Sequence, residues 1–114
     1  MKINTFEEIR SWQKARDLVR LIYKLFKDSK DYSFRDQIQR ASISIMNNIA
    51  EGFERRGDKE LSHFLFIAKG SSAEVKSMSY LALDLGCISK KEFETISILT
   101  TEISRLLSAF IKTL

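Results

Sequence analysis

Residues 33–56 read SFRDQIQRASISIMNNIAEGFERR, and residues 64–74 read FLFIAKGSSAE. Apolar residues recur in both stretches at spacings of three and four, which is the period of a helix that buries one face. In the first stretch these positions are Phe34, Ile38, Ala41, Ile45 and Ile49. We therefore predict two facing helices at the centre of a small helical bundle.

The rest of the chain extends this pattern. It has 114 residues, no proline and only four glycines, which suits long helices and disfavours a turn-rich β-sandwich or barrel. We predict one all-α domain over residues 1–114, folded as an antiparallel up-down-up-down four-helix bundle. The predicted helices span about residues 6–27, 33–56, 58–85 and 89–114.

Capping residues mark the expected helix ends. Ser33 is the expected N-cap of the second helix, and Asp58 that of the third. Gly86 suits the left-handed position that follows the third helix. Ser89, with Glu92 three residues later, matches a capping box before the fourth helix.

Two glycines lie inside helical patterns. Gly52 and Gly70 each cost about 1 kcal/mol relative to alanine at such positions. We expect the close approach of a neighbouring helix to offset this cost at both.

The third predicted helix is apolar nearly all round. Phe66, Ala73 and Tyr80 follow one another at sevens, away from the core-facing positions. A helix of this kind must be covered on nearly all sides, so we expect another subunit to cover it. The alternative is that this helix lies deepest in its own bundle. The candidate oligomer interface comprises Ile43, Met46, Phe66, Ala73, Met78, Tyr80 and Leu81.

Positive charge is concentrated at the start of the chain. Residues 1–30 carry eight Lys and Arg against four Asp and Glu, which accounts for the whole net charge of +4. The back of the first helix carries Arg16, Arg20, Lys24 and Lys27. Such a stripe is either a solvated face or a contact surface for phosphates. Secondary candidates for phosphate contacts are Arg40, Arg55 and Arg56.

Three polar residues stand near apolar faces, namely Asn48, Glu51 and Glu74. Paired carboxylates can act as acid and base, but such chemistry needs a pocket and a partner, and the sequence shows neither. We expect these three to form a structural polar network with Arg40 or Arg56 as counter-charge. No catalytic residue is predicted, and an enzyme is not expected.

No metal or cofactor is expected either. The chain has one cysteine, Cys87, and one histidine, His63, which cannot make the usual zinc cage or an intrachain disulfide. A helical ribonuclease of the HEPN class uses an Arg-x4-His motif, but Asp58 stands five residues before His63. No stacking platform for single-stranded bases is evident among the positions expected to be exposed.

The N-terminal residues show no secretory signal. The longest wholly apolar run is Phe64 to Ala68, far short of the roughly 20 residues of a membrane span. We therefore expect a cytoplasmic protein with no membrane contact.

The run Gln37-x-x-Arg40-Ala41-x-x-Ser44-Ile45-x-x-Asn48-Ile49-Ala50-Glu51-Gly52, followed by Arg56 and by Phe64-Leu65-x-Ile67-Ala68-x-Gly70-Ser71-x-x-Glu74, resembles a known family. It is similar to the four-helix-bundle proteins encoded in intervening sequences of bacterial 23S rRNA genes. Trp12-Gln13-x-Ala15 and Leu85-Gly86 also fit, so the resemblance covers nearly the whole chain.

This resemblance implies a four-helix bundle that assembles into a ring-shaped homopentamer. The accessory protein of diversity-generating retroelements is also similar, and there the pentamer binds a reverse transcriptase and nucleic acid through its basic surface. Members of the family often carry two adjacent basic residues where this chain has Gln39-Arg40, which implies a weaker nucleic-acid face here.

Two functional hypotheses follow. In the first, the protein is a basic oligomeric adaptor that binds RNA or DNA, together with a protein partner such as a reverse transcriptase. In the second, it is a protein interaction scaffold with no nucleic-acid role, and the basic stripe only keeps it in solution.

Overall fold

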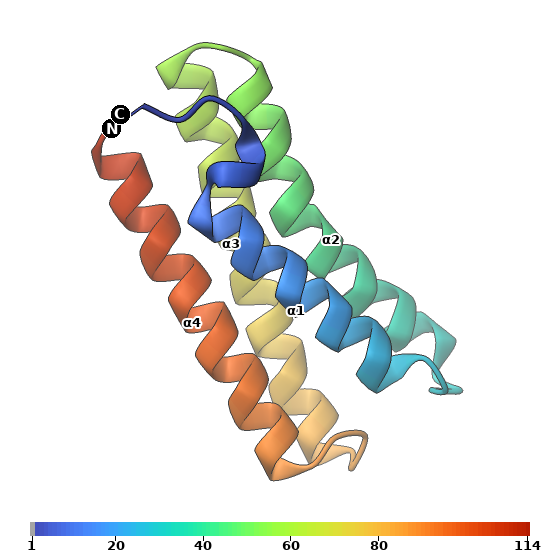
Figure 1. Cartoon of the computed structure of the whole chain (residues 1–114). Coiled ribbons are helices and arrows are strands. Elements are labelled where there is room, and N and C mark those ends of the chain that lie inside the picture. The colour runs from blue at the N-terminus through green and yellow to red at the C-terminus, as the bar shows by residue number, and fades with distance from the viewer. Residues whose placement is uncertain (1) are drawn as a thin grey trace.

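The computed structural model describes residues 2–114, which form four helices around one hydrophobic core (Figure 1). The helices are α1 (Arg10–Phe26), α2 (Tyr32–Glu54), α3 (Asp58–Asp84) and α4 (Lys90–Lys112). A 3-10 helix, η1 (Phe6–Glu8), precedes them, and no strand occurs within residues 2–114. The predicted all-α antiparallel bundle is therefore confirmed.

Consecutive helices pack side by side, and α1 also packs against α4. Within the described part of the chain, the backbones of α1 and α3 do not come close to each other, and neither do those of α2 and α4. The four helices thus occupy the corners of a square bundle, with α1 and α3 on one diagonal. The molecule measures 43 × 22 × 19 Å along its principal axes.

The core is built from the apolar stripes that the sequence predicts. Branched aliphatic side chains from all four helices are fully buried, among them Leu18, Ile45, Leu65 and Ile103. The stripe of α2 is confirmed at Ile38, Ala41, Ile45 and Ile49, each of which is buried. Hydrophobic burial of this kind supplies most of the driving force for folding.

The start of α2 differs from the prediction. Asp31, not Ser33, is the N-cap, and its Oδ1 accepts a hydrogen bond of 3.1 Å from the backbone N–H of Phe34. A carboxylate at this position also interacts favourably with the positive end of the helix, which a serine hydroxyl does not. The helix therefore begins one residue earlier than predicted.

Two other predicted boundaries and one predicted cap are also wrong. The first helix is interrupted at Ile9, whose extended backbone separates η1 from α1. The second helix ends at Glu54, and Arg56 follows in the left-handed region at φ 66°. The third helix begins at Asp58 as predicted, but its N-cap is Gly57 and not Asp58, and no side chain caps it.

The predicted caps around the α3–α4 turn are confirmed. Gly86 has φ 74°, and the N–H of Cys87 reaches back to the carbonyl of Ala82 at 2.9 Å, as in a Schellman motif. Ser89 accepts from the N–H of Glu92, and the Glu92 carboxylate accepts from the N–H of Ser89 at 2.8 Å. This capping box starts α4.

The two helical glycines differ from each other. Gly52 lies buried against α3, as predicted from the expected close approach of a neighbouring helix. The same explanation is wrong for Gly70 within this chain, since a Cβ there would meet nothing within 4 Å.

None of the helices within residues 2–114 has both the length and the apolar character needed to span a lipid bilayer.

Candidate nucleic-acid interface and self-association surface

The basic stripe of α1, defined as Arg16, Arg20, Lys24 and Lys27, is exposed along its whole length. It extends over twelve residues, 16–27, or about 16 Å at the rise of an α-helix. Arg20 stands 4.0 Å from Asp17, at the limit of an ion pair, and both side chains are exposed. No other salt bridge involves the stripe within the described residues, so its cations are available to an anionic partner.

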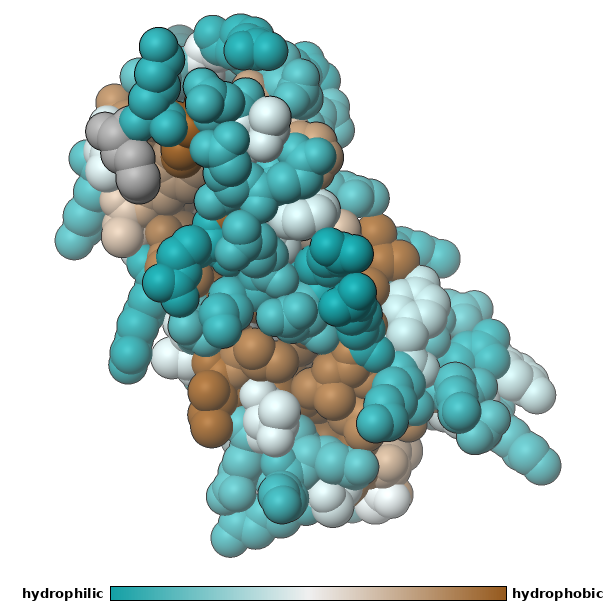
Figure 2. Space-filling model, in the orientation of Figure 1, coloured by the Kyte–Doolittle hydropathy of each residue, from teal (hydrophilic) through white to brown (hydrophobic). Residues whose placement is uncertain are grey.

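The other cations of α1 are already engaged. Arg10 and Lys14 lie 3.9 Å and 3.7 Å from the carboxylate of Glu102 on α4. These two cations therefore face α4 and are not part of the basic stripe. Figure 2 shows that the face formed by α1 and α4 is mostly hydrophilic, with an apolar area where the two helices diverge.

The three secondary candidates lie on the α2–α3 side of the bundle. Arg40 lines a small pocket of about 220 Å³ together with residues of α2 and α3. Arg55 donates to Glu51 at 2.7 Å, and its guanidinium also lies 5.1 Å from the ring centroid of Phe64. Arg56 is exposed in the turn between α2 and α3. Arg40 and Arg55 thus lie on the side of α2 that faces α3, apart from the basic stripe on α1.

The outward face of α3 exposes several large apolar side chains among polar ones such as Lys69 and Asp84. Phe66 is 57% exposed and Leu81 is 48% exposed, and Ala73 is exposed between them. Other large apolar side chains exposed on this helix are Ile67, Tyr80 and Leu85. The idea that α3 lies deepest in its own bundle is therefore wrong.

The remaining members of the candidate interface are less accessible. Ile43, Met46 and Met78 are half-buried, and the two methionines pack against the core. The sequence did not single out Ile98 on α4. Its side chain is 68% exposed, the highest value among the large apolar side chains of residues 2–114.

The three candidate structural residues have separate partners. Asn48 donates to the backbone oxygen of Ser44 at 2.8 Å and to its hydroxyl at 2.9 Å. The Ser44 hydroxyl in turn shares a hydrogen bond of 2.9 Å with that of Ser71 on α3. Glu74 accepts a hydrogen bond of 2.8 Å from Gln37. These contacts join α2 to α3 along one seam.

Glu51 takes no part in that seam. It accepts from Arg55 one turn later on α2, and this hydrogen bond raises the pKa of Arg55. The expected counter-charges Arg40 and Arg56 form no salt bridge within residues 2–114. Asn48, Glu51 and Glu74 are thus not joined to one another by a hydrogen bond or ion pair among the described residues.

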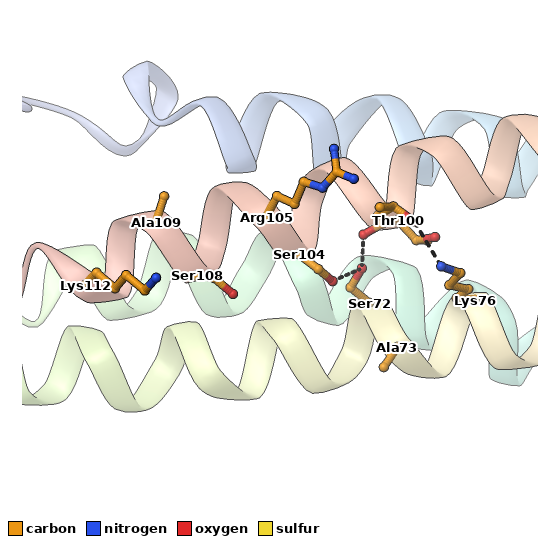
Figure 3. A pocket seen from close by; sticks show the side chains of 10 residues that line it. Ser72, Ala73, Lys76, Thr100, Ser104, Arg105, Ser108, Ala109 and Lys112 are labelled. Carbon is orange, nitrogen blue, oxygen red and sulfur yellow. Dashed lines mark hydrogen bonds between the residues drawn. The ribbon is translucent and has the colours of Figure 1, made fainter.

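A second feature that the sequence did not single out is a groove of about 470 Å³ between α3 and α4 (Figure 3). Ser72 donates to the backbone oxygen of Thr100 at 3.1 Å, and Lys76 donates to the hydroxyl of Thr101 at 2.9 Å. Figure 3 shows Ser104 turned toward Ser72 and Arg105 pointing away from α3. The small side chains let α3 and α4 approach, and the hydroxyls join them.

Two exposed aromatic residues were not singled out from the sequence. Two tyrosines are exposed near the basic stripe, Tyr23 on α1 at 41% and Tyr32 at the start of α2 at 60%. Sequence reasoning missed them because a tyrosine in an amphipathic helix fits a core edge as well as a surface.

No group of three His, Cys, Asp or Glu residues that could hold a metal ion occurs within residues 2–114. His63 is exposed, and its ring packs edge-on against that of Phe64 at 5.5 Å.

Known proteins share the sequence pattern and the fold of this chain. The family model described as 23S rRNA-intervening sequence protein matches residues 7–109. Among solved structures, the chain is similar to a protein of unknown function from the S23 ribosomal protein family of Bacteroides thetaiotaomicron. The two share 28% sequence identity with a TM-score of 0.78, over 90% of this chain and 94% of that one. The comparison with curated proteins found no match.

Proposed function

The chain belongs to the 23S rRNA-intervening sequence protein family, and from this premise we propose that it is a non-enzymatic, self-associating adaptor of the cytoplasm that binds RNA or DNA. In this role the basic stripe of α1 contacts phosphates, and the outward face of α3 packs against further copies in a ring, with five as the expected number.

One observation supports this role above the others. The basic stripe and the apolar face of α3 lie on opposite corners of the bundle, because α1 and α3 share a diagonal and their backbones do not come close to each other. Copies that associate through α3 would therefore leave every basic stripe facing outward. Several stripes on one particle would strengthen binding to a long nucleic acid through effective concentration.

Self-association is supported by the exposed residues of α3. Apolar patches of this kind on a small protein mark sites of interaction. Gly70 adds a second argument, since it costs the helix about 1 kcal/mol and no atom of residues 2–114 would lie within 4 Å of a Cβ there. A second helix packed at Gly70 would offset that cost.

A non-enzymatic role is supported by the state of the polar residues. Asn48 and Glu74 are engaged in contacts that join α2 to α3, and Glu51 is engaged with Arg55. They do not converge on a position where a reacting atom could sit.

The test is a titration of short RNA and DNA by fluorescence anisotropy at two salt concentrations. Four phosphate contacts predict that affinity for duplex DNA falls roughly 10²-fold between 50 and 200 mM salt. The double variant Arg20→Glu with Lys24→Glu reverses two charges of the basic stripe and should abolish binding at 200 mM salt. The matched control is Lys90→Glu with Lys91→Glu, an equal charge change in the first turn of α4, where acidic residues favour the helix.

The second hypothesis, a protein scaffold without nucleic acid, is favoured by the apolar face of α3 alone. Absence of binding at low salt, or equal losses in the stripe and control variants, would leave that hypothesis in place of the first.

A further inference from the structure

Tyr23 lies within the basic stripe. It is three residues after Arg20 and four before Lys27, and side chains at these spacings are neighbours on a helix surface. Its ring is 41% exposed. A strand whose phosphates contact Arg20 and Lys27 would therefore pass directly beside this ring.

Tyr32 borders the same surface from α2. The side of α2 that carries Gln37 and Ser44 faces α3, because these residues bond to Glu74 and Ser71. Tyr32, the first residue of α2, lies away from that side of the helix and is exposed. Since a short link joins the end of α1 to the start of α2, Tyr32 also lies at the Lys27 end of the stripe.

The Tyr32 ring is held in place although it is 60% exposed. The guanidinium of Arg35 stacks over it at 4.9 Å, and Arg35 is itself fixed by Asp36, with 3.1 Å from Nε to Oδ1. A ring that is already oriented loses less conformational freedom when a ligand stacks on it.

We propose that Tyr23 and Tyr32 are stacking platforms that make the basic stripe selective for single-stranded nucleic acid. This inference rests on the proposed function and names its ligand. Cations bind the backbone of either form, but only an unpaired base offers its face to an aromatic ring, because bases in a duplex are stacked on each other. Stacking tolerates any base, so selectivity is for strandedness and not for sequence.

The test compares a ten-nucleotide oligothymidine with a ten-base-pair duplex, both by fluorescence anisotropy at one salt concentration. Tyr23→Leu with Tyr32→Leu keeps apolar side chains and removes the aromatic faces. We expect this variant to lose about fivefold or more in affinity per ring for the single strand, with duplex binding unchanged. Tyr23→Phe with Tyr32→Phe keeps both faces and should bind within about twofold of the parent.

The other outcomes are separable. If the leucine variant binds oligothymidine like the parent while Arg20→Glu with Lys24→Glu still abolishes binding, stacking is overturned and phosphate binding stands. Equal losses for strand and duplex would also overturn stacking, because they would show that the rings only shape the surface. If neither ligand binds the parent at low salt, the proposed function itself fails. Circular dichroism and light scattering on each variant establish that fold and mass are unchanged.

Discussion

Gly52 of α2 lies directly against Phe64 of α3, so that a Cβ added at Gly52 would stand 2.6 Å from the Cβ of Phe64. Leu61 closes the same space from one turn earlier, with its Cδ1 at 3.2 Å. Glycine at this position therefore sets how closely the two central helices approach at the end where the chain turns from one to the other.

We predict that Gly52→Ala destabilises the fold. The added methyl group forces α2 and α3 apart, and overpacking of this kind costs about 1–3 kcal/mol. The better helix propensity of alanine offsets up to about 1 kcal/mol of this cost, so the free energy of unfolding should fall by about 1–2 kcal/mol. Chemical denaturation at low protein concentration measures it.

Gly70→Ala is the matched control, because it makes the same change within a helix where nothing lies within 4 Å. It should raise the free energy of unfolding of the isolated chain by up to about 1 kcal/mol. If both variants changed stability equally, the contact with Phe64 would not be what requires glycine at position 52.

We predict that Ser11→Ala stabilises the protein. Ser11 in the first turn of α1 is only 2% exposed, and its hydroxyl has no hydrogen-bond partner within residues 2–114. An unsatisfied buried polar group costs about 1–3 kcal/mol, so its removal should raise the free energy of unfolding by about 1 kcal/mol.

The comparison for this prediction is Ser72→Ala. Ser72 is equally buried but donates to the backbone oxygen of Thr100, so its loss should cost about 1 kcal/mol. Opposite signs for the two serines are expected in urea denaturation. A loss of stability at Ser11 would mean that its hydroxyl is satisfied in solution.

We predict that Asp31, and not Ser33, determines the stability of the start of α2. Asp31→Ala removes the hydrogen bond to the N–H of Phe34 and should cost about 1 kcal/mol. Ser33 is exposed and makes no cap, so Ser33→Ala should change stability by less than about 0.5 kcal/mol. Thermal unfolding of the two variants side by side would reject this assignment if Ser33→Ala proved the more damaging.

The sequence predicts the helices well because their core positions obey one period. Ile45 and Leu65 are buried for the reason that the pattern gives, namely that a stripe at spacings of three and four must face other stripes. The helix ends are less accessible to such reasoning. Asp31 and Ser33 are both good N-caps, and only the path of the preceding link decides which of them meets a free N–H.

The candidate site is predictable to a smaller extent. The basic stripe follows from the period, because residues opposite a buried stripe are exposed. The position of Tyr32 at the Lys27 end of that stripe does not follow from the period, since it depends on where the link after α1 places the start of α2. The α3–α4 groove combines residues such as Ser72 and Ser104, which lie 32 positions apart and share no motif.

Finally, we predict that the outward face of α3 holds the assembly together. Phe66→Glu with Leu81→Glu places two charges on a face that the isolated chain already exposes, so the fold of the single chain should persist. Burying those charges between copies would be very costly, and the particle should dissociate. Light scattering is expected to show about 66 kDa for five parent chains of 13.2 kDa, and a mass near that of one chain for the variant.

The control is Ile98→Glu, which adds charge at a 68% exposed position on α4 and should leave the mass unchanged. A parent protein that stays monomeric at high concentration would contradict self-association outright. An assembly that survives in the α3 variant but falls apart in the α4 control would instead place the contact on α4.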